Sequence, residues 1–84
     1  MIQRGTLLRY KGFETTPSVE IRAVMLPGHP EHDGGLPGIS FRWLKRRPRQ
    51  GWFYPCNTVE EFFADFRFSN LEAVDGSGDI TTPK

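Results

Sequence analysis

The sequence predicts a small, mainly β domain of the α+β class, in which about five strands form a strongly bent antiparallel sheet with one short C-terminal helix. Two observations carry this prediction. Short alternating or apolar runs recur along the chain between segments rich in glycine, proline and polar residues, a pattern typical of antiparallel strands. One segment near residue 60 instead has apolar residues at helical spacing, so a single helix is expected there.

The length of 84 residues predicts one domain, residues 1–74, followed by a flexible polar tail, residues 75–84. A core of this size buries only roughly 60% of the unfolded surface, so extra stabilisation is expected. Cys56 is the only cysteine, which excludes a disulfide within the chain. Self-association is the remaining route, and we expect a homo-oligomer, most simply a dimer.

The first half of the chain contains two candidate strands and a long loop. Residues 6–13 mix apolar, aromatic and charged side chains and suit a half-exposed strand. Residues 19–26 alternate and then become apolar, which indicates a second strand whose end is more deeply buried. The polar turn at residues 14–18 predicts a hairpin between them. Residues 27–38 contain four glycines and three prolines, which excludes a helix or a central strand.

A second hairpin is predicted from two aromatic runs. In a strand at residues 39–44, Ile39, Phe41 and Trp43 share one face. Residues 45–51 turn the chain, and residues 52–54 begin a fourth strand that Pro55 ends or bends. The side chains of three consecutive strand residues, Trp52, Phe53 and Tyr54, alternate between the two faces of the sheet. They cannot all be buried unless both faces are covered, so at least one ring is expected to be exposed or to lie in an interface.

The predicted helix begins at Thr58. Thr58 and Glu61 fit a capping box, in which each side chain accepts a hydrogen bond from the other residue's backbone amide. An apolar stripe follows at spacing i, i+3, i+4, i+7, formed by Val59, Phe62, Phe63 and Phe66. Eight or nine helical residues are too few to be stable alone, so the helix is expected to dock these rings on the sheet. Residues 68–74 then form either a fifth strand or an extended return of the chain.

Two architectures fit this order of elements. The sheet can curl into a small SH3-like barrel with the helix plugging one end, or it can stay open with the helix packed across one face. The small number of short strands favours a bent sheet or barrel over a flat sheet.

The candidate functional feature is the basic aromatic hairpin. Four of the five residues from Lys45 to Arg49 are cationic, and two tryptophans lie close by. Cations neutralise phosphates and flat rings stack on bases, so the hairpin predicts binding to nucleic acid or another polyanion. The candidate binding residues are Arg42, Trp43, Lys45, Arg46, Arg47, Arg49, Trp52 and Tyr54.

Two other interpretations of the hairpin remain open. It can be a solvated turn between core strands, with Trp43 and Phe53 inside. It can also belong to a protein-interaction module, such as a homo-oligomer, an adaptor or an inhibitor, that uses an exposed aromatic surface. The overall balance of charge, a net +1 with a pI near 7.9, is low for a dedicated nucleic-acid binder and favours a protein partner.

Enzymatic and metal-binding functions have weaker support. His29, Glu31, His32 and Asp33 lie in a glycine- and proline-rich loop without the spacing of known zinc sites. Nothing in the sequence places a histidine beside Cys56, as a thiol nucleophile would require. We therefore expect a non-enzymatic protein without catalytic residues, metal or cofactor, and regard a small enzyme assembled between subunits as a third possibility.

The sequence also bears on location. No apolar run reaches the roughly 20 residues of a membrane helix, and the first residues lack the hydrophobic stretch of a secretory signal. We expect a cytoplasmic protein with no membrane partner.

Overall fold

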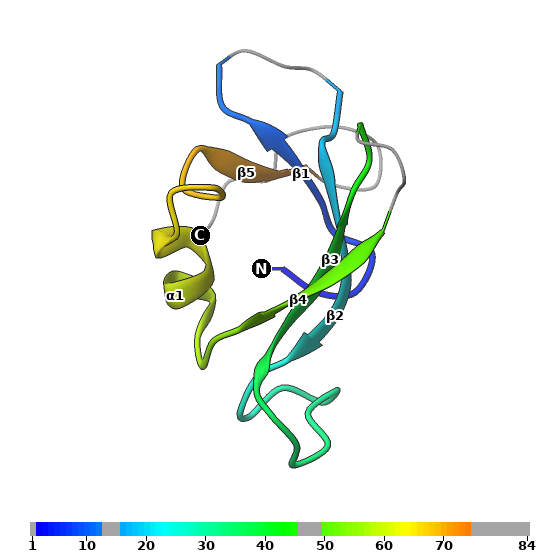
Figure 1. Ribbon diagram of the computed structural model, residues 1–84, viewed down its shortest axis with the longest axis vertical. Helices are drawn as coiled ribbons and strands as arrows, with labels where there is room; N and C mark the ends of the chain where they lie inside the picture. The colour runs from blue at the N-terminus through cyan, green and yellow to red at the C-terminus, as the bar shows by residue number, and fades with distance from the viewer. Residues whose placement is uncertain (1, 13–15, 46–49, 75–84) are drawn as a thin grey trace.

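The computed structural model describes residues 2–12, 16–45 and 50–74, and in these it confirms a mainly β fold with one short helix. All strand pairings are antiparallel. The elements run in the order predicted (Figure 1): β1 Leu7–Tyr10, β2 Val19–Met25, β3 Gly38–Trp43, β4 Gly51–Pro55, α1 Val59–Ala64 and β5 Leu71–Val74.

The strands form one bent sheet in the order β4-β3-β2-β1-β5. β4 and β5 are its two edges, so the sheet is open and does not close into a barrel. The sheet curves strongly, and α1 lies opposite its concave side in the gap between the two edges (Figure 1). Of the two predicted architectures, the structure has the open bent sheet with the helix over one face.

The alternation of β2 and β3 decides which face becomes the core. Ile21 pairs with Phe41 and Val24 with Ile39, and all four side chains are buried on the concave face. The register shifts between Ile21 and Ala23, which marks a bulge. Because a bulge bends a strand and increases its twist, it contributes to the curvature of the sheet.

The helix begins where the sequence predicts but is shorter. The Thr58 hydroxyl accepts a hydrogen bond from the Glu61 N–H at 3.1 Å, as expected of an N-cap. The reciprocal bond differs from the predicted capping box, because the Glu61 carboxylate accepts from the Asn57 N–H at 3.4 Å and not from the N–H of Thr58. α1 ends at Ala64, and Asp65 is already extended.

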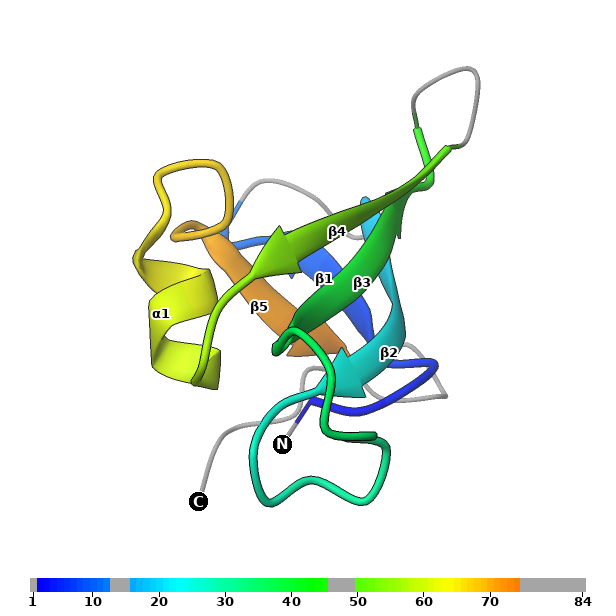
Figure 2. The same cartoon turned by 60° about the horizontal axis from the view of Figure 1, so that its bottom comes forward.

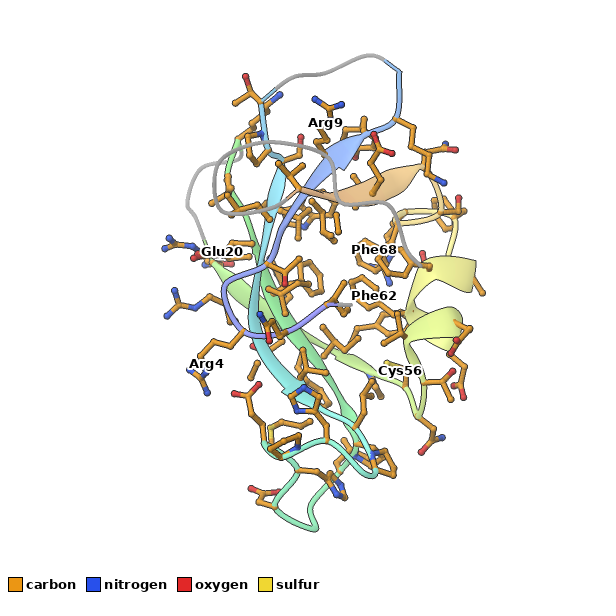
Figure 3. All side chains as sticks on the ribbon, turned by 180° about the vertical axis from the view of Figure 1, so that it is seen from behind. Arg4, Arg9, Glu20, Cys56, Phe62 and Phe68 are labelled. Atoms are coloured by element: carbon orange, nitrogen blue, oxygen red, sulfur yellow. The ribbon has the colours of Figure 1, made fainter. Side chains whose placement is uncertain are left out.

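This early end overturns the prediction that Phe66 is a core residue. Phe66 lies beyond the helix in a turn and is 85% exposed. Its expected place is taken by Phe68, which stacks on Phe62 with ring centroids 4.3 Å apart. Both of these rings are fully buried between α1 and the sheet (Figure 3).

The long loop after β2 is held by a carboxylate that the sequence suggested only as a weak metal ligand. The Glu31 side chain accepts a hydrogen bond from the Val24 N–H at 3.1 Å and pairs with Arg4 at 2.6 Å. These contacts hold the pKa of Glu31 below its ordinary value, with the bond from Val24 the largest cause. Glu31 therefore fastens the loop to β2 and to the N-terminal segment.

Two further expectations concern the C-terminal tail and a membrane-spanning helix. The predicted tail, residues 75–84, lies outside the described residues. Within the described residues, α1 is the one helix, and its six residues fall far short of a membrane span.

Candidate binding surface on strand β4

The β3–β4 hairpin extends away from the rest of the sheet (Figure 2). Phe41 pairs with Trp52 and Ile39 with Tyr54, so the two aromatic runs lie side by side as predicted. Arg46, Arg47 and Arg49, three of the predicted binding residues, lie outside the described residues. The described parts of the candidate surface are the last residues of β3, Lys45, and the whole of β4.

Trp52 is an exposed ring that lies close in sequence to the basic segment, residues 45–49. It lies opposite Phe41 and therefore on the concave side of the sheet, where β4 has no further strand beside it. Its side chain is 53% exposed, although the large side chain of tryptophan normally buries most of its surface. The sequence expectation that at least one ring of this strand is exposed is confirmed by Trp52.

Phe53 is a second exposed ring, on the opposite side of the same strand. It pairs with Ser40 on the convex face and is 42% exposed. The interpretation that places Phe53 inside is therefore wrong, because strand alternation puts it on the face opposite Phe41. Its ring crosses Gly38, where a Cβ atom would overlap the Phe53 ring and come 2.6 Å from the Tyr54 carbonyl oxygen. Gly38 is required for this close approach.

Trp43 and Tyr54, both predicted to bind a partner, are largely committed to the core. Trp43 is half-buried, stacks near Phe68 with centroids 6.0 Å apart, and meets Phe41 edge to face at 5.8 Å. Tyr54 meets Phe62 and Phe68 edge to face. These two rings pack against the core and are only partly exposed, so they contribute less to the exposed surface than Trp52 does.

Tyr54 also joins a polar network with the turn after α1. Its hydroxyl group donates to the Asp65 carboxylate, and burial followed by the Asp65 charge raises the pKa of Tyr54. Arg67 grips the same carboxylate at 3.0 and 3.1 Å, which holds the pKa of Asp65 below its ordinary value. The Arg67 guanidinium group also lies 5.6 Å from the centre of the Tyr54 ring. This network fixes the end of β4 against the turn.

The cations of the described surface differ in their surroundings. Arg42 lies on the convex face opposite Glu20, and their side chains form an ion pair at 2.5 Å. Glu20 also lies 3.5 Å from Arg22 (Figure 3 shows Glu20 on this outer side). Lys45 is exposed just beyond β3. The Glu20 carboxylate thus lies near two guanidinium groups, so the cluster of Glu20, Arg22 and Arg42 has a net positive charge.

The backbone of β4 offers hydrogen-bonding groups along its outer side. The Cys56 N–H donates to the Pro37 carbonyl at 3.2 Å, and in an antiparallel pair the bonded positions alternate. Trp52 and Tyr54 therefore bond to β3, whereas Gly51 and Phe53 direct their N–H and C=O groups outward. Pro55 has no N–H to offer. An edge strand of this kind can take up another strand.

Other candidate groups are not arranged for chemistry. Cys56 is buried, and its burial raises the pKa of the thiol, which lowers its nucleophilicity at neutral pH. In the described part of the chain, no group of three or more histidine, cysteine and carboxylate side chains is placed to hold a metal ion.

Sequence reasoning missed two exposed phenylalanines. The exposure of Phe53 could have been inferred from strand alternation, because Phe53 points to the same face of the hairpin as the polar residue Ser40. Phe66 has none, since its exposure depends on where the helix ends. Comparisons with protein-family models, with curated proteins and with solved structures found no match for this chain.

Proposed function

We propose that this protein binds single-stranded nucleic acid through the β3–β4 hairpin. The observation that carries the proposal is the exposure of Trp52 at the end of β4 that adjoins the cationic segment 45–49. A tryptophan free to stack, beside cations able to neutralise phosphates, is the combination that sequence-tolerant single-strand binders use. Lys45 lies just beyond the neighbouring end of β3 and would add to the positive potential, whereas Arg42 lies on the opposite face from Trp52 and is paired with Glu20.

A fluorescence-anisotropy titration with a labelled oligonucleotide tests this proposal. Binding should weaken as the salt concentration rises, because each neutralised phosphate releases condensed counterion. Each such phosphate should lower the affinity by roughly 0.7–0.9 log units per log unit of salt. Changing Arg46, Arg47 and Arg49 together to serine should reduce that slope by about two to three.

Trp52→Ala separates stacking from charge. It should cost roughly 1–3 kcal/mol of binding without changing the salt slope. Phe66→Ala is the matched control, because it removes another exposed ring that lies in the turn after α1 and should leave affinity unchanged. Equal binding by the wild type and the triple variant, or no binding below about 100 μM at low salt, would refute the proposal.

A second candidate function is protein–protein interaction, and the open edge of β4 favours it. Gly51 and Phe53 direct backbone N–H and C=O groups outward, and the side chains of Trp52 and Phe53 are exposed on the two faces of the same strand. Added strands gain affinity from main-chain hydrogen bonds and specificity from alternate side chains, and β4 offers both. Absence of nucleic-acid binding in the titration above would leave this function as the stronger candidate.

A further inference from the structure

We propose that β4 pairs with β4 of a second copy of this chain, in antiparallel register about a two-fold axis at Phe53. The inference names the partner of the protein-interaction candidate above. It does not depend on nucleic-acid binding.

The first support is the composition of the edge. Natural edge strands are usually protected by charged side chains, bulges or coverage. β4 reads GWFYP, with three consecutive aromatic residues and no charge, and only Pro55 blunts it. Trp52 and Phe53 leave apolar surface exposed on both sides of one strand. Such an edge is suited to being covered.

The second support is the pattern of backbone groups. With the axis at Phe53, each Phe53 N–H donates to the Phe53 carbonyl of the other copy. Each Gly51 N–H then meets the Pro55 carbonyl of the other copy. The missing N–H of Pro55 falls at the end of the shared ladder, where an edge strand tolerates proline. No donor already used by β3 has to be released.

The side chains match in the same register. The two Phe53 rings become cross-strand neighbours on the convex face, and Trp52 comes opposite Tyr54 of the second copy on the concave side. Aromatic pairs at such positions each contribute roughly 0.2–1 kcal/mol in an antiparallel sheet. An isologous contact of this kind closes on itself and gives a dimer.

Charge identifies a second copy in preference to an unrelated strand. Four of the five residues from Lys45 to Arg49, which precede β4 in the sequence, are cationic, whereas the chain after β4 reaches the exposed carboxylates Glu60 and Glu61. In sequence order, antiparallel alignment sets the end of each β4 that follows the basic residues beside the end of the other copy's β4 that leads to Glu60 and Glu61. Opposite charges at both ends favour this direction of pairing over the parallel one.

Sedimentation equilibrium of the nuclease-treated protein tests the proposal without nucleic acid. We expect a dimer at concentrations on the order of 100 μM, weakened by salt because of the charged flanks. Phe53→Lys should lower the association constant about tenfold or more, since like charges would meet at the axis. Phe66→Lys is the matched control and should leave the constant unchanged.

Cross-linking tests the register and remains informative if Phe53→Lys is unstable. Only position 53 meets itself, with a Cα separation of about 5.5 Å that a disulfide can span. Phe53→Cys should therefore form a disulfide-linked dimer on mild oxidation, whereas Trp52→Cys, Phe66→Cys and the wild type with its buried Cys56 should not.

Three results would overturn the proposal. One is a wild-type monomer at concentrations on the order of 100 μM. A second is a larger ring or filament, which would indicate pairing of β4 with β5 of another copy. The third is oxidation of Phe66→Cys to dimers as fast as Phe53→Cys.

Discussion

Phe66 and Phe68 lie two residues apart in one turn, yet Phe66 is 85% exposed and Phe68 is fully buried. The turn is fixed by Asp65, whose backbone carbonyl accepts from the N–H groups of Phe68 and Ser69, both at 2.9 Å. Its side chain accepts from the Arg67 N–H at 2.8 Å. These bonds aim residue 68 at the core and residue 66 at solvent.

The two rings should therefore respond very differently to truncation. Phe68→Ala removes a ring that stacks on Phe62 and touches Phe41, and should lower the free energy of unfolding by about 3–5 kcal/mol. Phe66→Ala should change it by no more than about 0.5 kcal/mol. Urea denaturation measures both. Similar losses for the two variants would show that Phe66 is also packed.

At the scale of elements, α1 has six residues and is held by its N-cap and by tertiary contacts. Isolated helices of this length are unstable in water, so propensity contributes little. Phe62 is the one fully buried residue of the helix, and Phe63 packs partly against the core. The Thr58 cap is the local interaction that fixes where the helix starts.

Loss of this cap should be measurable. Thr58→Ala removes the acceptor for the Glu61 N–H and should lower the free energy of unfolding by about 1 kcal/mol. Thr58→Ser keeps the hydroxyl group and should lie within a few tenths of a kcal/mol of the wild type. Chemical denaturation followed by far-ultraviolet circular dichroism compares the three proteins. Equal stability of the alanine variant would mean that water replaces the hydroxyl group at no cost.

At the scale of the whole molecule, carboxylates connect segments that are distant in the chain. Glu31 ties the long loop to β2 and Arg4, and Asp65 ties the turn after α1 to the end of β4 through Tyr54. Arg9 and Glu72 lie 3.5 Å apart across the β1–β5 pair, which joins the two ends of the described chain. Ionised carboxylates thus hold together parts that the central strands do not connect.

Acid should therefore destabilise the fold in a defined window. Folding lowers the pKa values of Glu31 and Asp65, so their stabilising contribution is present above their unfolded values of about 4. It is lost as the pH falls through their folded values. Asp65→Asn should be less stable than the wild type at pH 7, and the difference should shrink below about pH 4.

Urea melts between pH 7 and pH 3 measure this difference. Arg67→Gln should show the same convergence, because the guanidinium group is the largest cause of the lowered pKa of Asp65. A gap between wild type and Asp65→Asn that stays constant down to pH 3 would contradict the role assigned to the ionised carboxylate.

Much of the fold could be predicted because it depends on local patterns. Alternation assigned Ile39 and Phe41 to the core face, and proline and glycine marked the long loop after β2. The cap at Thr58 placed the helix start. The candidate site was predicted less completely, because whether Trp43, Trp52 or Tyr54 is exposed depends on which strand lies beside β4, and periodicity does not contain that information.

The sequence by itself determined the elements, their order and the concentration of positive charge beside two tryptophans, since periodicity, turn residues and charge are local properties. Only the tertiary structure decided that β4 is an edge strand, that α1 ends at Ala64 and that Phe68 replaces Phe66 in the core. These outcomes depend on contacts between residues far apart in the chain, such as β1 with β5 and Phe68 with Phe41. The exposure of Trp52 and Phe53 follows from those contacts.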